Sequence, residues 1–282
     1  MRVLVTGSTG PTSSIVLAEL KRRDIDVRGV IRSEDRADAA RANGADETVV
    51  ADLTDSSSLA SAMEGVDGVF ATIPAFPPDE EGLGLSMVEA AIEAGVPKFV
   101  FSGVYHPSLS LTNHAGKRPA EEALYDSDLD FTVLQPAMFM QTMGAAWPQV
   151  LETGVYAQPY SAEVRLTYVD YRDVAEVAAE AFAGDRLSRG TFELASGGMV
   201  TRVDIARLMS EVLGRRIEAE TLPFDRFADE AGMPEGPSRD GFGRMVAAYS
   251  DHGFHGGNPV VLRALLGRDP RTLEAYLREL AA

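Results

Sequence analysis

The first half of the chain alternates between short apolar runs and segments whose apolar residues recur at helical spacing. Five apolar runs predict buried strands, over residues 2–6, 26–31, 47–53, 68–73 and 98–102. Helical spacing separates these runs over residues 12–23, 36–43, 57–64 and 85–94. The strands are continuously apolar, which is typical of a parallel sheet covered by helices on both faces. The pattern predicts an α/β fold with a Rossmann-like, doubly wound parallel sheet.

The rhythm of strand and helix loosens beyond residue 130. Three further strands are predicted over residues 130–135, 165–169 and 190–195, with a helix between the last two over residues 171–183. We therefore expect a sheet domain over residues 1–150, completed by elements from about residues 165–195, and a smaller α/β lobe over residues 151–282.

The C-terminal part carries three local signals. Thr201 and Asp204 match a capping box that opens a helix over residues 201–213. Gly, Pro and Asp are frequent over residues 232–258, and this composition predicts a loop or a lid. Asp269-Pro270 predicts the start of a last helix, with an N-cap residue followed by proline.

Composition narrows the class of protein. The 282 residues carry a formal net charge of −17 and no Cys, which excludes disulfides and thiol nucleophiles. A chain this acidic lacks the basic surface that neutralises phosphates, so we expect no binding to nucleic acid or to an anionic membrane. No apolar run approaches the roughly 18 residues of a membrane span, and no basic leader precedes the first strand, so we expect a cytoplasmic protein. The oligomeric state stays open.

A glycine-rich turn joins the first predicted strand to the first predicted helix. It reads Gly7-Ser8-Thr9-Gly10-Pro11-Thr12, with Ser13 where a third glycine is expected. At this position of a doubly wound fold, glycines permit a tight turn and a close approach of the backbone to a pyrophosphate. The helix N-terminus adds N–H groups, and the two threonines add hydroxyl donors. The turn predicts a dinucleotide site; the alternative is a turn with a purely structural role.

Arg32 follows the second predicted strand, where the residue type distinguishes two nicotinamide cofactors. A carboxylate there accepts the ribose 2′-hydroxyl of NAD, whereas an arginine binds the 2′-phosphate of NADP. We therefore expect NADP(H) to be favoured over NAD(H), with assistance from Arg36. The alternative is an ordinary surface charge, and the nearby Glu34 and Asp35 support that alternative.

In their order along the chain, these residues resemble the NmrA-like branch of the atypical short-chain dehydrogenases/reductases. The resemblance covers nearly the whole chain and rests on Gly7–Gly10, Arg32, Asp52-Leu53, Phe99–Ser102, Tyr105-His106-Pro107, His114, Lys117, residues 131–136, Tyr168-Val169-Asp170, Asp173-Val174-Ala175 and residues 270–274. It implies an NAD(P)-binding Rossmann domain, a small C-terminal substrate lobe and a nicotinamide cofactor in the cleft between them. Members include NADPH-dependent reductases of quinones and plant phenolics, and redox sensors that bind the nucleotide without turning it over.

The resemblance also implies which residues hold the cofactor. Asp52 and Leu53 would lie by the adenine, and residues 72–74 would run along the cofactor. The expected cofactor-binding set is Gly7, Ser8, Thr9, Gly10, Pro11, Thr12, Arg32, Asp52, Leu53, Thr72, Ile73, Pro74, Ser102 and Lys117.

The chemistry that the resemblance implies centres on Lys117. A typical short-chain dehydrogenase uses Tyr-x-x-x-Lys, in which the tyrosine protonates the substrate oxygen. Asn113 stands in the place of that tyrosine. In the reductases that the chain resembles, the lysine alone does much of the work, so Lys117 would bind the ribose hydroxyls and stabilise a developing alkoxide. The alternative is a surface lysine that pairs with Glu121, four residues further on.

Two further side chains are candidate proton donors. His114 lies at the N-terminal edge of a helix that we expect to begin near residue 115, and it either relays a proton or hydrogen-bonds a loop. Tyr105 follows the fifth predicted strand, at the sheet edge where ligands bind, and either donates a proton or packs beneath the substrate.

An apolar stretch with several methionines follows Pro136. Such a stretch is more often core than pocket, yet the resemblance places it at the substrate cleft, and methionine suits an adaptable apolar pocket. The expected pocket, which suits an aromatic or quinone-like substrate, comprises Tyr105, Met138, Phe139, Met140, Trp147 and Tyr168. His252 and His255 lie in a glycine-rich segment without a third ligand, so we expect no metal site.

Three functions are compatible with these residues. The first is an NAD(P)H-dependent oxidoreductase that reduces a carbonyl, enone or quinone of an apolar or aromatic small molecule with NADPH. The second is a regulatory protein that binds NADP(H) without turnover, which the missing tyrosine and Ser13 favour. The third is an epimerase or dehydratase with a tightly held cofactor, although related sugar enzymes normally need the tyrosine.

Overall fold

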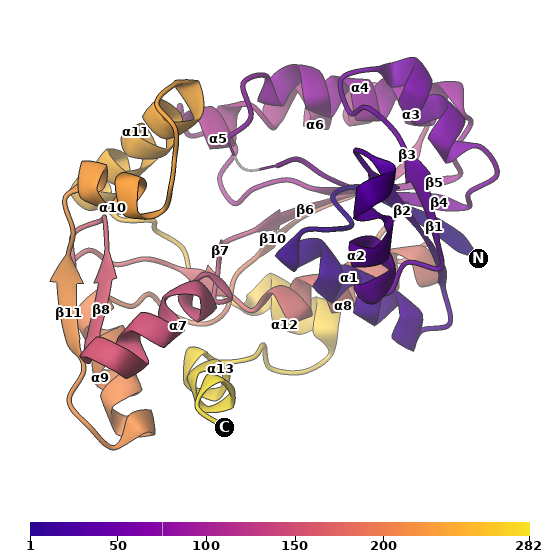
Figure 1. Ribbon diagram of the computed structural model, residues 1–282. Helices are drawn as coiled ribbons and strands as arrows, with labels where there is room; N and C mark the ends of the chain where they lie inside the picture. The colour runs from indigo at the N-terminus through magenta and orange to yellow at the C-terminus, as the bar shows by residue number, and fades with distance from the viewer. Residues whose placement is uncertain (75) are drawn as a thin grey trace. The chain divides into compact units, whose positions relative to one another are not determined.

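The chain divides into two compact units. A computed structural model describes residues 1–74 and 76–282 (Figure 1). Unit 1 comprises Met1–Pro136 and Val174–Glu193, and unit 2 comprises Ala137–Asp173 and Leu194–Ala282. The first stretch of unit 1 thus ends at Pro136, ahead of the boundary near residue 150 that the sequence suggested.

A seven-stranded sheet forms the centre of unit 1, in the order β10-β6-β5-β4-β1-β2-β3. Its strands are β1 (Arg2–Val5), β2 (Asp26–Ile31), β3 (Glu47–Val50), β4 (Gly68–Thr72), β5 (Lys98–Ser102), β6 (Asp130–Pro136) and β10 (Gly190–Leu194). The successive pairings from β3 through β2, β1, β4 and β5 to β6 are parallel. The strand order reverses between β1 and β4, and open α/β sheets bind ligands at such a point.

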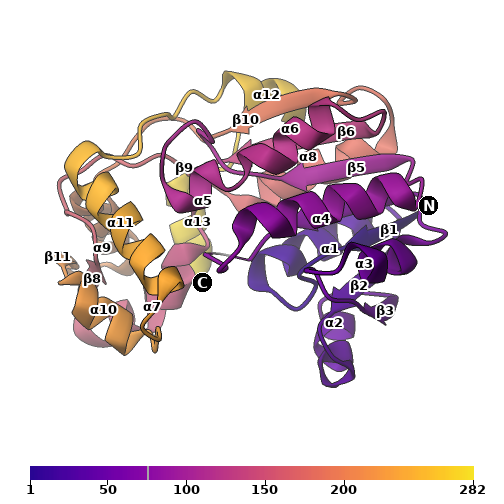
Figure 2. The same cartoon turned by 90° about the horizontal axis from the view of Figure 1, so that it is seen from above.

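Helices cover both faces of this sheet. One face carries α3 (Ser56–Met63), α4 (Glu80–Glu93) and α6 (Arg118–Tyr125), and α4 packs against both of the others (Figure 2). The other face carries α1 (Pro11–Arg22) and the unit 1 part of α8 (Tyr171–Ala183) (Figure 1). Apolar side chains between the sheet and the first helix layer are fully buried, among them Leu59, Met87, Phe99, Phe101 and Leu124. The predicted Rossmann-like fold is confirmed.

Short helical segments complete unit 1: η1 (Glu34–Arg36), α2 (Ala37–Ala42) and α5 (Thr112–Ala115). The start of α4 differs from the sequence pattern, because this helix begins at Glu80 and not near residue 85. The carboxylate of Asp79 caps this helix by accepting a hydrogen bond from the N–H of Gly82. Two glycines in the first turns hid the helix start, since glycine has a low helix propensity.

Unit 2 contains two small sheets and six helices. Strand β7 (Met138–Phe139) pairs with β9 (Tyr168–Val169), and β8 (Val155–Gln158) pairs with β11 (Glu218–Thr221). The helices within the described part of unit 2 are α7 (Thr142–Thr153), α9 (Arg202–Leu213), α10 (Phe224–Glu230), α11 (Pro237–His252), α12 (Val260–Leu266) and α13 (Leu273–Leu280). The predicted capping box of α9 is confirmed, because Thr201 and Asp204 each accept a hydrogen bond from the backbone N–H of the other.

The prediction of a loop or lid over residues 232–258 is wrong, because α11 occupies most of this segment. Met245 and Tyr249, one helical turn apart, are buried. A Cβ atom on Gly243 would lie 2.9 Å from the ring of Phe224 in α10. This glycine therefore marks a close approach between two helices rather than a flexible loop.

The prediction that Asp269-Pro270 starts the last helix is also wrong. Helix α13 begins at Leu273, and the hydroxyl of its N-cap residue Thr272 accepts a hydrogen bond from the N–H of Ala275. The backbone N–H of Arg271 instead donates to the carboxylate of Asp173 at 2.7 Å, which fixes this segment ahead of the helix.

Candidate functional site

The glycine turn has the geometry that a dinucleotide requires. Gly7 adopts a left-handed conformation with φ of +64°, which glycine reaches without steric cost. The N–H of Gly10 donates to the carbonyl of Gly7 at 2.8 Å and closes the turn. Ser13 is buried, and its hydroxyl donates to the carbonyl of Thr6 at 3.3 Å. The replacement of the third glycine is thus accommodated by a hydrogen bond back to the end of strand β1.

The N-terminus of α1 is open to a ligand. Gly10 is its N-cap residue, Pro11 is its first residue, and neither a side-chain cap nor an acidic residue occupies its first turn. Its first N–H groups and the positive end of its dipole are therefore available to phosphates. Thr9 is exposed and Thr12 is half-buried at this turn, whereas the buried Ser8 hydroxyl donates to the carbonyl of Val30 at 2.7 Å. Ser8 therefore stabilises the turn through its side chain.

The carboxyl ends of the strands bring the predicted cofactor residues to one edge of the sheet. The hydroxyl of Thr6 links β1 to β4, because it donates to the carbonyl of Thr72 at 2.9 Å and accepts from its N–H at 2.8 Å. Thr72 lies opposite Ser102 in the register of β4 and β5. Residues that follow the strands at this edge are Gly7, Arg32, Asp52, Leu53, Ile73 and Pro74.

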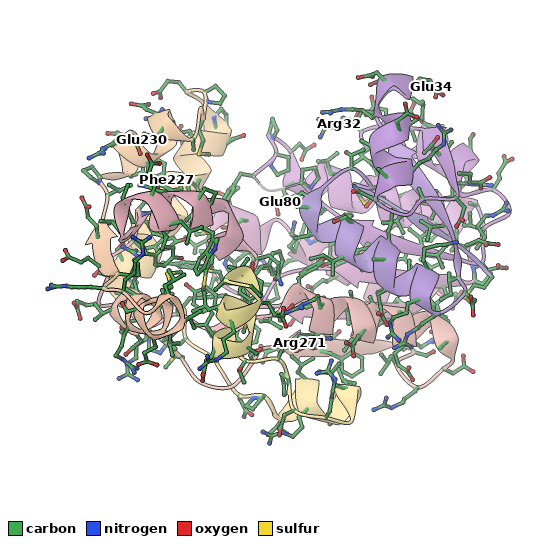
Figure 3. All side chains as sticks on the ribbon, turned by 60° about the horizontal axis from the view of Figure 1, so that its bottom comes forward. Arg32, Glu34, Glu80, Phe227, Glu230 and Arg271 are labelled. Atoms are coloured by element: carbon green, nitrogen blue, oxygen red, sulfur yellow. The ribbon has the colours of Figure 1, made fainter. Side chains whose placement is uncertain are left out.

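Arg32 and Asp52 follow the neighbouring strands β2 and β3. The Arg32 side chain is exposed and projects outward (Figure 3), and no ion pair involves it among the residues that the structure describes. Hydrogen bonds from the N–H and hydroxyl of Thr54 lower the pKa of the Asp52 carboxyl, and the positive charge of Arg32 adds to this effect. Arg32 therefore offers an accessible guanidinium at the edge of the site.

Lys117 is buried, and its partner is not the one that its helical spacing suggested. Its ammonium nitrogen lies 2.5 Å from Oε1 of Glu80, the first residue of α4. Glu121 instead accepts two hydrogen bonds from the side-chain amide of Gln135, at 2.9 and 3.1 Å. Burial lowers the pKa of the Lys117 ammonium, and the negative charge of Glu80 opposes that shift.

Sequence reasoning missed Glu80, although a signal for it was present. A buried lysine requires a carboxylate nearby, and the acidic run over residues 79–81 directly precedes a helical apolar pattern. Acidic residues are favoured in the first turn of a helix, so this run could have indicated the true start of α4.

His114 is enclosed by the protein. It lies in α5, while α6 begins only at Arg118, so the helix expected to begin near residue 115 is two separate helices. The Nδ1 atom of His114 lies 3.1 Å from the carbonyl oxygen of His106. Burial lowers the pKa of His114, which favours the neutral imidazole. These contacts support the alternative in which His114 fixes the loop that follows β5.

Tyr105 belongs to the same loop and is buried too. Its N–H donates to the carbonyl of Pro136 at 3.0 Å, and its ring centroid lies 4.0 Å from that of His106. Burial raises the pKa of the phenol, so it stays protonated at neutral pH.

The other predicted pocket residues lie in unit 2. Met140 and Tyr168 line a cavity of about 300 Å³ together with Ser196, Arg263 and Arg271. Met138 and Phe139 form β7 and are half-buried, and Trp147 is buried in α7. The ring of Phe139 packs edge-on against Tyr171, with centroids 4.5 Å apart. The apolar stretch therefore contributes partly to the core of unit 2 and partly to the wall of a cavity.

The described residues contain neither a candidate metal site nor a candidate membrane-spanning helix. No group of three or more His, Cys, Asp and Glu side chains is arranged to hold a metal ion. None of the helices in residues 1–74 and 76–282 has the length and apolar character needed to cross a membrane.

The sheet order and the glycine turn define a Rossmann-like protein of the NAD(P)-binding class. The sequence pattern of the NmrA-like family matches residues 1–277, and the chain belongs to this family. The resemblance drawn from the sequence is confirmed, and the family includes NAD(P)H-dependent oxidoreductases.

Three known proteins illustrate the similarity. The chain is 26% identical over 239 residues to an NAD(P)H azoreductase from Xenophilus azovorans, covering 83% of this chain and 82% of that protein. It is 29% identical over 224 residues to (4-alkanoyl-5-oxo-2,5-dihydrofuran-3-yl)methyl phosphate reductase from Streptomyces griseus, covering 79% and 78%. An NADPH-dependent quinone oxidoreductase from Escherichia coli, solved in complex with NADPH, shares the fold with a TM-score of 0.82 at 21% identity, over 99% of this chain and 100% of that chain.

Proposed function

We propose that the protein is an NADPH-dependent reductase of a carbonyl, enone or quinone group in an apolar or aromatic small molecule. The observation that carries this proposal is the buried Lys117, which pairs with Glu80 at the start of α4, the helix that follows β4, in a unit that also carries the open turn over Gly7–Thr12. A dinucleotide fits the residues at the carboxyl edge of the sheet, because the turn offers backbone donors and Arg32 offers a guanidinium for a 2′-phosphate. The similarity to an NAD(P)H azoreductase and to a second reductase supports the same chemistry.

The residues of the chain have distinct roles in this reaction. Bound NADPH would supply a hydride to the substrate carbon. The α1 N-terminus and the turn would hold the pyrophosphate, and Arg32 would bind the 2′-phosphate. The Lys117 ammonium would stabilise negative charge that develops on the substrate oxygen, which is the kind of preorganised electrostatic interaction that enzymes use most. The proton would come from Tyr105, His114 or water.

A first experiment titrates the purified protein with NADPH, NADP, NADH and NAD in a calorimeter. We expect the phosphorylated pair to bind at least tenfold more tightly, which corresponds to about 1.4 kcal/mol. Binding of none of the four would contradict the proposal at its base.

The second experiment measures NADPH oxidation with quinones, aldehydes and enones. With any substrate that the wild type reduces, Lys117→Ala should lower kcat by about a hundredfold, the typical cost of removing one group that stabilises an oxyanion. Lys21→Ala is the matched control, because Lys21 is an exposed lysine in the last turn of α1 that pairs with Asp46. Full turnover by Lys117→Ala would remove Lys117 from the mechanism.

A regulatory protein that binds NADP(H) without turnover is the second candidate. Two observations favour it: Asn113 stands in the place of the usual tyrosine, and the Lys117 ammonium is already held by Glu80. Tight binding of NADPH with no oxidation by any class of substrate would support this candidate over the reductase.

A further inference from the structure

Glu80 and Lys117 form a buried ion pair between two helices of unit 1. Glu80 begins α4 and Lys117 is the N-cap residue of α6, and these helices pack against each other. The side chains are only 3% and 9% exposed, and 2.5 Å separates Nζ from Oε1. A charge pair with so little contact with water is costly unless each of its polar atoms finds a partner.

One oxygen of this pair is unsatisfied. Within residues 1–74 and 76–282, Oε2 of Glu80 is buried and has no hydrogen-bond partner. A buried acceptor on a charged group is rarely left without a donor, since it has lost its water and gained nothing in return. The missing partner is therefore a donor that the described protein does not supply.

We propose that Glu80 positions Lys117 and completes with it a binding site for a ligand hydroxyl. A hydroxyl group both donates and accepts hydrogen bonds, whereas an ammonium only donates and a carboxylate only accepts. The pair therefore matches a hydroxyl on both counts: Lys117 donates to its oxygen, and Oε2 of Glu80 accepts its proton. This inference rests on the proposed function for the source of the hydroxyl, which is either a ribose of the nucleotide or the alcohol of a reduced substrate.

Other titratable groups near Lys117 do not replace Glu80. His114 in α5 is held neutral by burial, which lowers its pKa, and the charge of Lys117 adds to that shift. Glu121 in α6 is bound to the amide of Gln135. Burial lowers the pKa of Lys117, and the Glu80 carboxylate is the counter-charge that opposes this shift.

The positioning role can be tested on the lysine itself. The chain contains three lysines, Lys21, Lys98 and Lys117, so NMR of protein carrying 13C-labelled lysine resolves a small set of side-chain signals that Lys→Arg variants assign. We expect Glu80→Gln to lower the titration midpoint of Lys117 by at least one pH unit. Glu81→Gln, an exposed neighbour in the same helical turn, should leave it unchanged. An unchanged midpoint in Glu80→Gln overturns the positioning role.

The hydroxyl site is tested by calorimetry with three probes: NADPH, adenosine 2′,5′-bisphosphate, which lacks the nicotinamide ribose, and hydroquinone, the reduced form of a quinone. If Glu80→Gln weakens the binding of NADPH at least tenfold and leaves the binding of the bisphosphate unchanged, the hydroxyl belongs to the ribose. If Glu80→Gln weakens only the binding of hydroquinone, measured with NADP bound, the hydroxyl belongs to the substrate. Equal weakening of every probe, or of none, overturns the hydroxyl site.

Folding and function are kept apart in this design. If Glu80→Gln does not fold, Glu80→Asp replaces it in both measurements. The shorter side chain keeps the charge but moves the oxygens away from Lys117, so we expect a smaller fall in the Lys117 midpoint and the same order of effects on the three probes. A wild-type protein that reduces no substrate would refute the reductase but leave the lysine titration and the NADPH binding readable. Different results would therefore refute the reductase function and the role of Glu80.

Discussion

At the scale of single residues, we predict that Arg32 favours NADPH over NADH. Its guanidinium is exposed at the end of β2 and has no ion-pair partner in the described part of the chain. Arg32→Ala should weaken the binding of NADPH at least tenfold, about 1.4 kcal/mol, because only NADPH carries the 2′-phosphate. The affinity for NADH should stay within twofold of the wild-type value. Calorimetric titration with both nucleotides measures the two affinities. Arg41→Ala is the control, since Arg41 is an exposed arginine of α2 that pairs with Asp38; equal loss for both nucleotides in Arg32→Ala would refute the role.

The site residues that sequence reasoning predicted share one property: their signal is local. The glycine turn and Arg32 each follow a recognisable strand, so their place at the sheet edge could be predicted from position alone. Lys117 could be named as a candidate by its resemblance to a family lysine. Its pairing with Glu80 could not be predicted, because that contact depends on how α4 packs against α6. Helical spacing pointed to Glu121, whose side chain instead contacts Gln135 in the sheet.

At the scale of elements, the buried contact between Glu121 and Gln135 fixes α6 to β6. Burial raises the pKa of the Glu121 carboxyl. The folded state therefore holds this proton to a higher pH than the unfolded state, whose glutamate titrates near about 4.3. Stability contributed by the protonated form is present below that value and is lost as pH rises to the folded pKa.

Glu121→Gln removes this titration. As pH rises from 4 towards 7, the wild type should therefore lose free energy of unfolding relative to the Glu121→Gln variant. Urea unfolding at a series of pH values measures the difference. Glu122→Gln, an exposed neighbour on the same helix, should follow the wild-type curve. A constant difference between Glu121→Gln and wild type across this range would show that Glu121 is as readily ionised in the folded protein as in the unfolded chain.

Strands whose apolar pattern is continuous were predicted well, and helices that contain glycine were not. The strands of the sheet and the helix over residues 171–183 follow from their apolar periodicity alone. Helix α11 was missed because Gly241 and Gly243 lower helix propensity, whereas the structure uses Gly243 for contact with Phe224. Local composition cannot distinguish a glycine that permits flexibility from one that permits close packing, since the difference lies in a partner distant in sequence.

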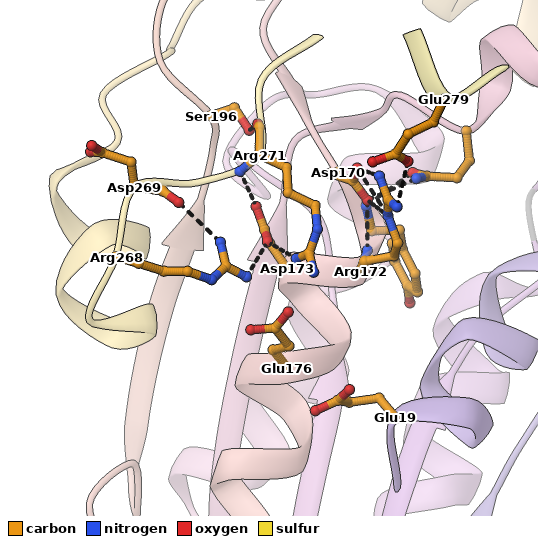
Figure 4. A network of polar contacts seen from close by, with 12 residues as sticks. Glu19, Asp170, Arg172, Asp173, Glu176, Ser196, Arg268, Asp269, Arg271 and Glu279 are labelled. Carbon is orange, nitrogen blue, oxygen red and sulfur yellow. Dashed lines mark hydrogen bonds and ion pairs between the residues drawn. The ribbon is translucent and has the colours of Figure 1, made fainter. Parts of the chain in front are cut away.

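At the scale of the whole molecule, a buried carboxylate holds the C-terminal segment, residues 258–282, against the rest of unit 2. Asp173 is completely buried at the start of α8, and both Arg268 and Arg271 donate to it (Figure 4). The neighbouring Asp170 binds Arg172, which also reaches Glu279 in α13. These contacts connect residues far apart in the sequence, so the position of the last helix depends on them.

Asp173→Asn should therefore destabilise the protein and release the C-terminal segment first. Removing one partner of a buried ion pair costs about 3–5 kcal/mol, and we expect about 3, because both arginines are roughly one-third exposed and regain water. Urea unfolding measures this loss, and limited proteolysis should detect early cleavage over residues 258–282. Arg278→Ala breaks an exposed pair with Glu274 within α13 and should cost less than about 0.5 kcal/mol. Equal stability and equal proteolysis of the two variants would show that α13 is held by its apolar face, through Tyr276 and Leu277, rather than by Asp173.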